Sequence, residues 1–314
     1  MSKDQDPVWF WKNFRMGTEL QNSGAFLYNA IYCLDQMETL HHEEECFEFL
    51  YNTSIGLERL FKIALVLIEH DEHSNQDEFE KTLITHSNSE LISHITKKHK
   101  INIGKPHSRF LSLTDKFYKT TRYGRFNLSS VYEKNHDKFG LVEFIESELE
   151  LDLQGNGMFA IPIDEKIKKY LGKLIGKFAV QVYEIIRTEA WRNKTFTYEI
   201  RYGSKAFKIF MEQKFDFTKE RIAQRESLLH ILRNGIDAKY QEFLDSIPPI
   251  NLESLTTDEY IKNVFCYDLQ GQVKEELNYV YEEDKPNLQR IEDLLIIGTG
   301  VDFESMDSDW TEDE

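Results

Sequence analysis

The sequence contains few cysteines, few prolines and no long apolar run. Its 314 residues include three cysteines and six prolines. Three scattered cysteines are too few for a disulfide framework or a thiolate zinc site, which favours a reducing cytosol. The longest aliphatic run, residues 63–68, is far shorter than the roughly 20 residues that span a bilayer, and the N-terminus lacks the apolar core of a signal peptide. We therefore expect a cytoplasmic protein without a membrane segment.

The scarcity of proline leaves long stretches in which apolar residues recur three and four positions apart, which is typical of amphipathic helices. The clearest stripe includes Ile167, Leu171 and Phe178, and the pair Ser87 and Glu90 has the spacing of a capping box at a helix start. A polar loop is expected after residue 70. The pattern predicts an all-α, multi-helix bundle with helices at about 17–37, 44–70, 87 onward, 106–121, 137–149, 164–187, 205–214, 217–245, 257–268, 270–283 and 287–297.

The chain is expected to divide into a helical bundle over 1–190 and a C-terminal helical region over 191–300 that packs on it. The pair Pro248-Pro249 marks a boundary near 246–252. Residues 149–163, with Gly-Asn-Gly at their centre, could form a small β-hairpin, and the alternation over 196–202 fits either a strand or a helix terminus. Residues 301–314 are too acidic to pack and should form a disordered tail.

Charge is unevenly distributed along the chain. The 38 Lys and Arg residues face 55 Asp and Glu residues, a formal charge of −17 that excludes a protein that is basic overall. Residues 94–125 nevertheless hold nine Lys or Arg and a single acid, Asp115, whereas 252–314 hold eighteen acids and four bases. Nucleic-acid binding is thus expected from a local basic window, residues 94–125, with contacts from Lys97, Lys98, Lys100, Lys105, Arg109 and Lys119.

Cations and aromatic rings alternate over residues 117–126, FYKTTRYGRF. Lys and Arg suit phosphates and aromatic faces such as Tyr123 suit unpaired bases, so this composition favours RNA or single-stranded nucleic acid. The alternative is a solvated helix end whose Phe117 and Tyr118 face the core. Arg201 and Lys205 add cations beside further aromatic rings. They could form a second surface that continues the nucleic-acid-binding surface or, as we favour, an exposed turn before a helix.

Two single residues are candidates for catalysis. Arg59 lies in a strongly apolar helix, where its guanidinium needs either a structural ion-pair partner or an active-site role; the neighbouring Glu58 and Lys62 have the spacing of a surface ion pair. His86 directly precedes an expected N-cap, where backbone amides favour an anion and a neutral imidazole. It could activate a nucleophile or face a phosphate, or it could be a plain loop histidine.

Three segments together resemble the HEPN superfamily: GLERLFK at 56–62, THSNSELI at 85–92 and RYGRF at 122–126. The resemblance covers about 17–190, at most to 235. It implies a compact, often dimeric helical bundle and a metal-independent ribonuclease of anti-phage defence, of the abortive-infection or toxin–antitoxin kind. Its partners would be RNA or another single-stranded nucleic acid, a second copy of the chain, and an antitoxin or other defence protein, with no metal or cofactor.

Catalytic members of that superfamily commonly carry Arg followed four to six residues later by His, which only Arg225 and His230 match here. Residues five apart in a continuous helix point roughly 140° away from each other, so this pair needs a helix break or a second chain. A different set, Arg59, His86, Arg122 and Arg125, could converge on a phosphate, with the histidine as general acid or base.

Two further hypotheses concern the whole chain. In the first, the protein is an inactive helical interaction module that binds a protein partner in a defence complex. In the second, residues 302–314 cover the basic window as a nucleic-acid mimic. No glycine-rich phosphate loop, metalloprotease helix motif or serine nucleophile elbow occurs in the sequence.

Overall fold

The computed structural model describes residues 6–71, 73–124, 126–128, 137–153, 161–250, 256–266, 269–283 and 288–300. Within these ranges the regular structure is helical, apart from an isolated antiparallel bridge between Thr39 and Pro162, so the all-α prediction is confirmed. The centre of the expected hairpin, 154–160, and the acidic tail lie outside the described residues. No described helix is both long enough and apolar enough to cross a membrane.

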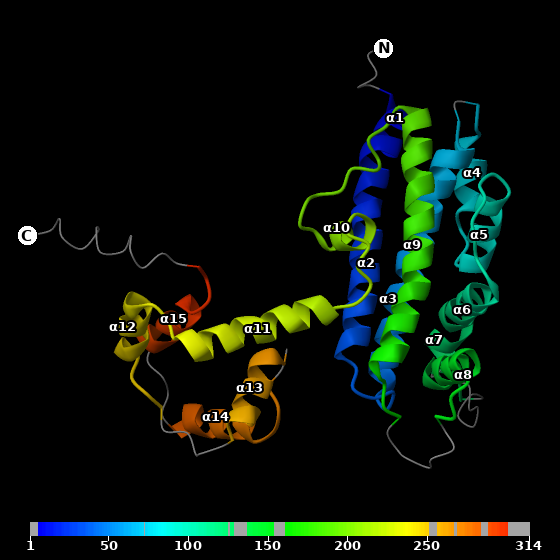
Figure 1. Cartoon of the computed structure of the whole chain (residues 1–314). Coiled ribbons are helices and arrows are strands. Elements are labelled where there is room, and N and C mark those ends of the chain that lie inside the picture. The colour runs from blue at the N-terminus through cyan, green and yellow to red at the C-terminus, as the bar shows by residue number, and fades with distance from the viewer. Residues whose placement is uncertain are drawn as a thin grey trace, which may run out of the picture. The chain divides into compact units, whose positions relative to one another are not determined.

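The chain forms two units, Met1–Arg221 and Ile222–Glu314. The helices of the first unit (Figure 1) are α1 (Pro7–Phe10), η2 (Trp11–Arg15, a π-helix), α2 (Met16–Gln36), α3 (Glu43–Glu69), α4 (Gln76–Thr82), α5 (Asn88–Thr96), α6 (Lys105–Lys116), η3 (Phe117–Thr121, a π-helix), α7 (Arg122–Gly124), α8 (Asp137–Leu149), α9 (Glu165–Asn193), α10 (Lys205–Phe210) and the start of α11 (Thr218–Asn234).

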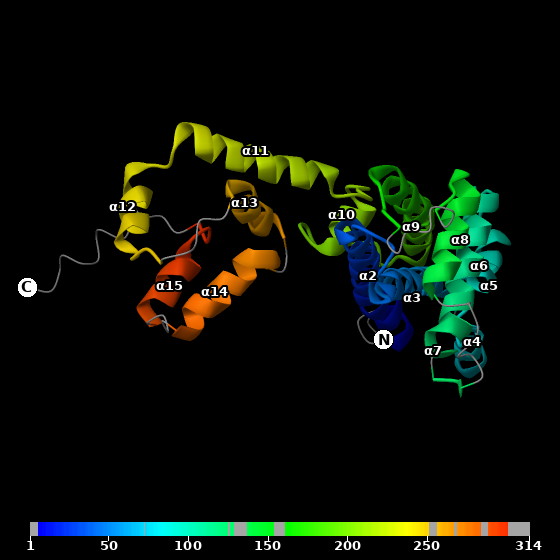
Figure 2. The same ribbon diagram turned by 90° about the horizontal axis from the view of Figure 1, so that it is seen from below.

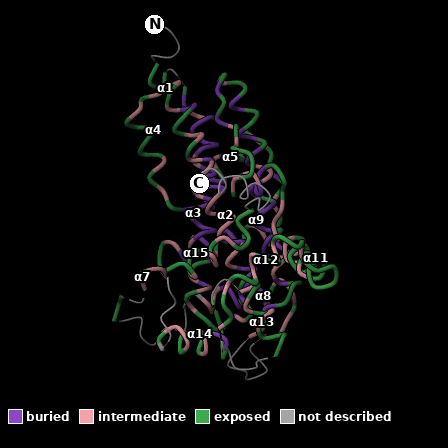
Figure 3. Tube along the Cα trace, turned by 90° about the vertical axis from the view of Figure 1, so that its left-hand side faces the viewer, coloured by how far each residue is buried: buried purple, intermediate pink, exposed green. Residues whose placement is uncertain are grey.

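The long helices α2, α3 and α9 lie side by side and carry most of the buried residues (Figures 1 and 3). The apolar stripe predicted for α9 is buried, and the ring of Phe178 meets that of Phe61 on α3 with centroids 6.0 Å apart. Gly56 lets α3 approach α2, since a Cβ there would lie 2.6 Å from Leu27 Cδ2. Helices α5, α6 and α8 lie on one side of the α3–α9 pair and α10 on the other (Figures 1 and 2).

The prediction of a polar loop after residue 70 is wrong in part. Helix α4 begins at Gln76, within the segment expected to be a loop. The side chain of Asn75 accepts a hydrogen bond from the backbone N–H of Glu78 and so caps this helix, and Phe79 is buried. A helix this short offers too few apolar positions for the helical period to be detected.

The segment after α9 packs on the bundle and extends the first unit beyond the boundary expected at residue 190. Phe215 lies against Gly172 and Gly176 of α9, and Ala206 of α10 lies against Gly24 of α2. Residues 196–202 are not in a strand; they follow the end of α9, so the helix-terminus alternative describes them. The unit therefore continues to Arg221.

The second unit is described separately and contains the rest of α11, α12 (Ala238–Ser246), α13 (Thr257–Phe265), α14 (Gly271–Glu283) and α15 (Leu288–Ile296). The single helix predicted over 217–245 is wrong, because Gly235 takes a φ of +75° and Asp237 caps a new helix. Pro248-Pro249 follows α12 inside this unit. Among its described residues, only Val273 is buried.

Candidate functional site

His86 lies in the loop before α5 and contacts a carboxylate on α3. Its Nδ1 is 3.2 Å from both carboxylate oxygens of Glu58. Glu58 is 12% exposed and also accepts a 2.6 Å hydrogen bond from Lys62, which confirms the predicted pair one turn apart. The His86 side chain remains 54% exposed. A fixed carboxylate thus orients an imidazole that solvent and ligands can reach, an arrangement suited to proton transfer.

Tyr118 of η3 connects this imidazole to an arginine. The His86 and Tyr118 ring centroids are 5.0 Å apart, and Arg122 Cζ lies 3.8 Å from the Tyr118 centroid and 4.4 Å from that of Tyr123. His86 and Arg122 thus contact the same ring, and their convergence on a phosphate stays a prediction. Arg122 forms no ion pair with any described residue. Its charge is held by aromatic faces instead.

The structure assigns Arg59 to a different contact. Its guanidinium pairs with Glu19 and lies 5.6 Å from the Phe26 ring centroid, and both partners are on α2. Consecutive helix positions point about 100° apart, so Glu58 faces His86 while Arg59 faces α2. This is the structural ion pair that the sequence analysis gave as one alternative. Arg125, the remaining member of the predicted set, lies outside the described residues.

The start of α5 is occupied by a carboxylate from α6. Asp115 accepts hydrogen bonds from the Ser87 hydroxyl at 2.9 Å and from the backbone N–H groups of Asn88 at 2.6 Å and Ser89 at 3.2 Å. Asp115 therefore already binds the amides at this helix start, and whether His86 itself faces a phosphate stays a prediction.

The basic window runs along α6 and beyond both of its ends. Five of the predicted lysines are exposed and form no ion pair within the described part of the chain: Lys97, Lys98, Lys100, Lys105 and Lys119. Arg109 differs, since it binds Glu148 at 2.6 Å and the Ser147 hydroxyl at 2.5 Å on α8. Of these five, Lys105 begins α6, whose twelve residues extend about 18 Å, Lys119 is in η3, and Lys97, Lys98 and Lys100 follow α5.

Arg225 and His230 lie on one uninterrupted helix, α11, and contact different groups. Arg225 Cζ is 5.1 Å from the Phe265 ring centroid, and His230 Nδ1 is 3.0 Å from the side-chain amide of Asn234. No helix break brings the two together. Their cooperation stays a prediction that requires a second chain.

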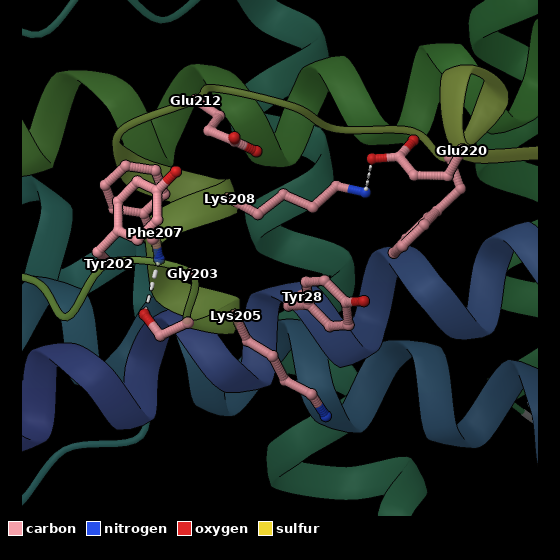
Figure 4. A pocket seen from close by; sticks show the side chains of 10 residues that line it. Tyr28, Tyr202, Gly203, Lys205, Phe207, Lys208, Glu212 and Glu220 are labelled. Atoms are coloured by element: carbon pink, nitrogen blue, oxygen red, sulfur yellow. Dashed lines mark hydrogen bonds and ion pairs between the residues drawn. The ribbon is translucent and has the colours of Figure 1, made fainter. Parts of the chain in front are cut away.

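Arg201 and Lys205 flank an exposed turn before α10, which confirms the favoured interpretation of that segment. Gly203 takes a φ of +70° in the turn, and Arg201 is exposed. Lys205 and Tyr202 also line an open pocket of about 300 Å³ on the first unit (Figure 4). Nothing in the local sequence pattern indicates a cavity, because the pocket needs Tyr28 from α2.

Comparison with known proteins gives no family: no family model, no curated protein and no solved structure matches this chain. Within the described residues, no group of three or more His, Cys, Asp or Glu side chains is placed to hold a metal ion. His86 and Arg122 are candidates from the sequence alone. The sequence does not indicate that Glu58 binds His86, or that Tyr118 contacts both His86 and Arg122. Those contacts join α3, the loop before α5 and η3, and no local spacing indicates them.

Proposed function

We propose that the protein binds single-stranded RNA along the basic window and cleaves it at His86 without a metal ion. The observation that carries the proposal is the Glu58–His86 pair beside Arg122, both held against Tyr118. A histidine oriented by a carboxylate can take up and release a proton near neutral pH, and an arginine without an acidic partner can bind phosphate. The resemblance to HEPN proteins adds anti-phage defence and a homodimer to this proposal.

The reaction needs proton transfers at the 2′- and 5′-oxygens and one displacement at phosphorus. His86 takes the proton of a ribose 2′-hydroxyl, the 2′-oxygen attacks the adjacent phosphorus, and the bond from phosphorus to the 5′-oxygen breaks. The 5′-oxygen takes a proton from water, and the hydroxide that remains takes the proton of the His86 imidazolium, which leaves a 2′,3′-cyclic phosphate, a 5′-hydroxyl and a neutral His86. Glu58 stabilises the imidazolium that forms, and Arg122 stabilises the charge on the phosphate oxygens. Tyr123, 58% exposed, and Phe126, 85% exposed, offer rings to neighbouring bases.

Cleavage with a chelator present tests the proposal. Purified protein is incubated with end-labelled single-stranded RNA and excess chelator, beside His86→Ala and His230→Ala variants. We expect cleavage by the unmodified protein, a loss on the order of 100-fold or more in His86→Ala, and little change in His230→Ala. An unchanged rate in His86→Ala, or a rate that the chelator abolishes, would contradict the proposal.

Replacing Glu58 tests how His86 is held. Glu58→Gln keeps the shape of the side chain but removes the charge that stabilises the imidazolium, so we expect a rate loss of about tenfold or more and a changed pH–rate profile. The matched control is Glu19→Gln, which removes the carboxylate paired with Arg59. Equal rate losses in the two variants would show that Glu58 acts only through general stability.

One observation favours a second candidate function, that of a protein-binding module. The second unit exposes large apolar side chains on several helices, including Leu232 at 64%, Val264 at 71% and Leu295 at 71%. Amphipathic helices that bury so little need another surface to cover their apolar faces. If the unmodified protein cleaves no RNA but forms a stable complex through residues 222–300, this function replaces the first.

A further inference from the structure

A pocket of about 300 Å³ opens on the first unit where the 202–204 turn and α10 meet α2 and the start of α11. Figure 4 shows Tyr202 and Phe207 at one end, Glu220 at the other, and Tyr28 and the stem of Lys208 between them. The pocket is distinct from the His86 site, because α10 and α5 lie on opposite sides of the α3–α9 pair (Figures 1 and 2).

Lys208 lines the pocket, and Glu220 neutralises the charge of its ammonium. The residue is 9% exposed, and its ammonium lies 2.7 Å from a carboxylate oxygen of Glu220 and 3.4 Å from the Phe217 ring centroid. On the opposite rim, Glu212 is paired with Lys214 at 3.1 Å. These charges cancel locally, so none of them alone selects a ligand of one sign.

Lys205 is the cation of the pocket that no described carboxylate neutralises. Its ammonium donates to the Asn29 side-chain oxygen at 2.7 Å and lies 5.2 Å from the Tyr28 ring centroid. These two contacts hold the side chain in one direction, and Figure 4 shows it running past Tyr28 with its ammonium away from Tyr202. A positioned ammonium with one neutral acceptor retains donors for an anionic group.

Tyr202 supplies an exposed aromatic face at the mouth of the pocket. The residue is 85% exposed, and its ring meets Phe207 edge-on, with centroids 4.9 Å apart. This contact steadies the ring and leaves a face for a flat partner. Stacking on such a ring tolerates any nucleobase, because every base has a flat π face.

We propose that this pocket binds a mononucleotide unit, with its base stacked on Tyr202 and a single phosphate on Lys205. One uncompensated ammonium suits one phosphate rather than a polyphosphate, because the other charges of the pocket are paired with each other. The volume is at the lower end of the range for small-molecule sites, which fits a nucleoside-sized ligand. The unit can come from a free nucleoside monophosphate or from a nucleotide within single-stranded RNA, because both carry the same base and phosphate. The site does not depend on cleavage at His86.

Calorimetric titration of the full chain with adenosine 5′-monophosphate, and separately with a short single-stranded RNA, tests the pocket. Tyr202→Leu and Lys205→Gln should each weaken binding about tenfold or more, while Tyr202→Phe and Lys205→Arg should retain it. Lys173→Gln, which removes an exposed lysine of α9, is the charge-matched control and should leave binding of the mononucleotide unchanged. Unfolding curves confirm that each variant folds.

The two titrations distinguish the sources of the nucleotide. If the ligand is a free mononucleotide, adenosine 5′-monophosphate should bind, and Tyr202→Leu should abolish this binding. If the ligand is a nucleotide within RNA, only the oligonucleotide should bind, and Tyr202→Leu and Lys205→Gln should weaken its binding in the same way. The proposal is overturned if neither substitution weakens binding of either probe. His86→Ala should leave the mononucleotide affinity intact, so cleavage and pocket binding can fail independently.

Discussion

His107, a histidine of the basic window, lies beside the ring of Phe178 with centroids 5.5 Å apart. Its Nδ1 is buried and has no hydrogen-bond partner within the described residues. Burial lowers the pKa of His107, and the nearby charge of Lys177 lowers it further. Because the folded pKa lies below the unfolded value, the unfolded chain binds more protons, and this group's contribution to stability falls as the pH drops below about 6.5.

Replacing His107 should therefore reduce the acid sensitivity of the fold. In His107→Gln, the loss of unfolding free energy between pH 7.5 and pH 5.5 should be smaller than in the unmodified protein, as measured by urea unfolding at the two pH values. Equal losses in the two proteins would show that His107 titrates alike in the folded and unfolded chains.

Gly176 on α9 is a position where a single methyl group should damage the packing. A Cβ there would meet the ring of Phe215, with Cε2 at 2.6 Å and Cγ at 2.7 Å. Overpacking of this kind costs about 1–3 kcal/mol, so Gly176→Ala should lower the urea midpoint. The control is Gly17→Ala, where a Cβ meets nothing within 4 Å and helix propensity should add about 0.5–1 kcal/mol. Similar effects of the two substitutions would contradict the packing seen at Phe215.

Among single residues, the sequence names candidates but not the partners that they contact. His86 and Arg122 were candidates because of their chemistry, and the Glu58–Lys62 pair follows from helix periodicity alone. The sequence did not indicate that Glu58 also binds His86, since the two are 28 positions apart. Contacts of that kind depend on how helices pack, which no local pattern encodes.

At the scale of elements, the start of α5 depends on the contact with α6. Asp115→Ala removes the acceptor for the Ser87 hydroxyl and two backbone amides, which should cost about 1–3 kcal/mol of unfolding free energy. Chemical denaturation of the variant gives the value, with Lys116→Ala, an exposed neighbour, as control. A variant as stable as the control would mean that solvent replaces Asp115 at no cost.

The long helices were predictable and the short connections were not. Helices α2 and α3 begin and end within a residue or two of the predicted 17–37 and 44–70, because their apolar stripes are long. Helix α4 and the break at Gly235 were missed, since each is decided by one capping side chain or one backbone torsion angle. The helix predicted over 205–214 ends at Phe210, and the segment 195–217 buries Phe210 and Phe217 and so extends the first unit.

For the whole molecule, the distribution of the core predicts which part folds alone. The buried residues of the main apolar cluster lie between Leu20 and Phe217. A fragment over residues 1–236 should therefore unfold cooperatively with a melting temperature close to that of the full chain. Loss of the cooperative transition in this fragment would show that residues 237–314 contribute to the core.

The same fragment tests whether the second unit mediates self-association. If a second copy covers the apolar helices after residue 236, light scattering should give a dimer for the full chain and a monomer for the fragment. A dimeric fragment would instead place the contact between copies within residues 1–236.

The chemistry at His86 is tested most directly by analysis of the cleavage products. An RNA oligonucleotide and its 2′-deoxy counterpart are incubated with the protein in excess chelator, and the ends of the products are identified by mass spectrometry. If the 2′-oxygen attacks, only the RNA should be cleaved, and its products should carry a 2′,3′-cyclic phosphate and a 5′-hydroxyl. The His86→Ala variant should give neither product. Cleavage of the deoxy strand, or the same products from His86→Ala, would contradict it.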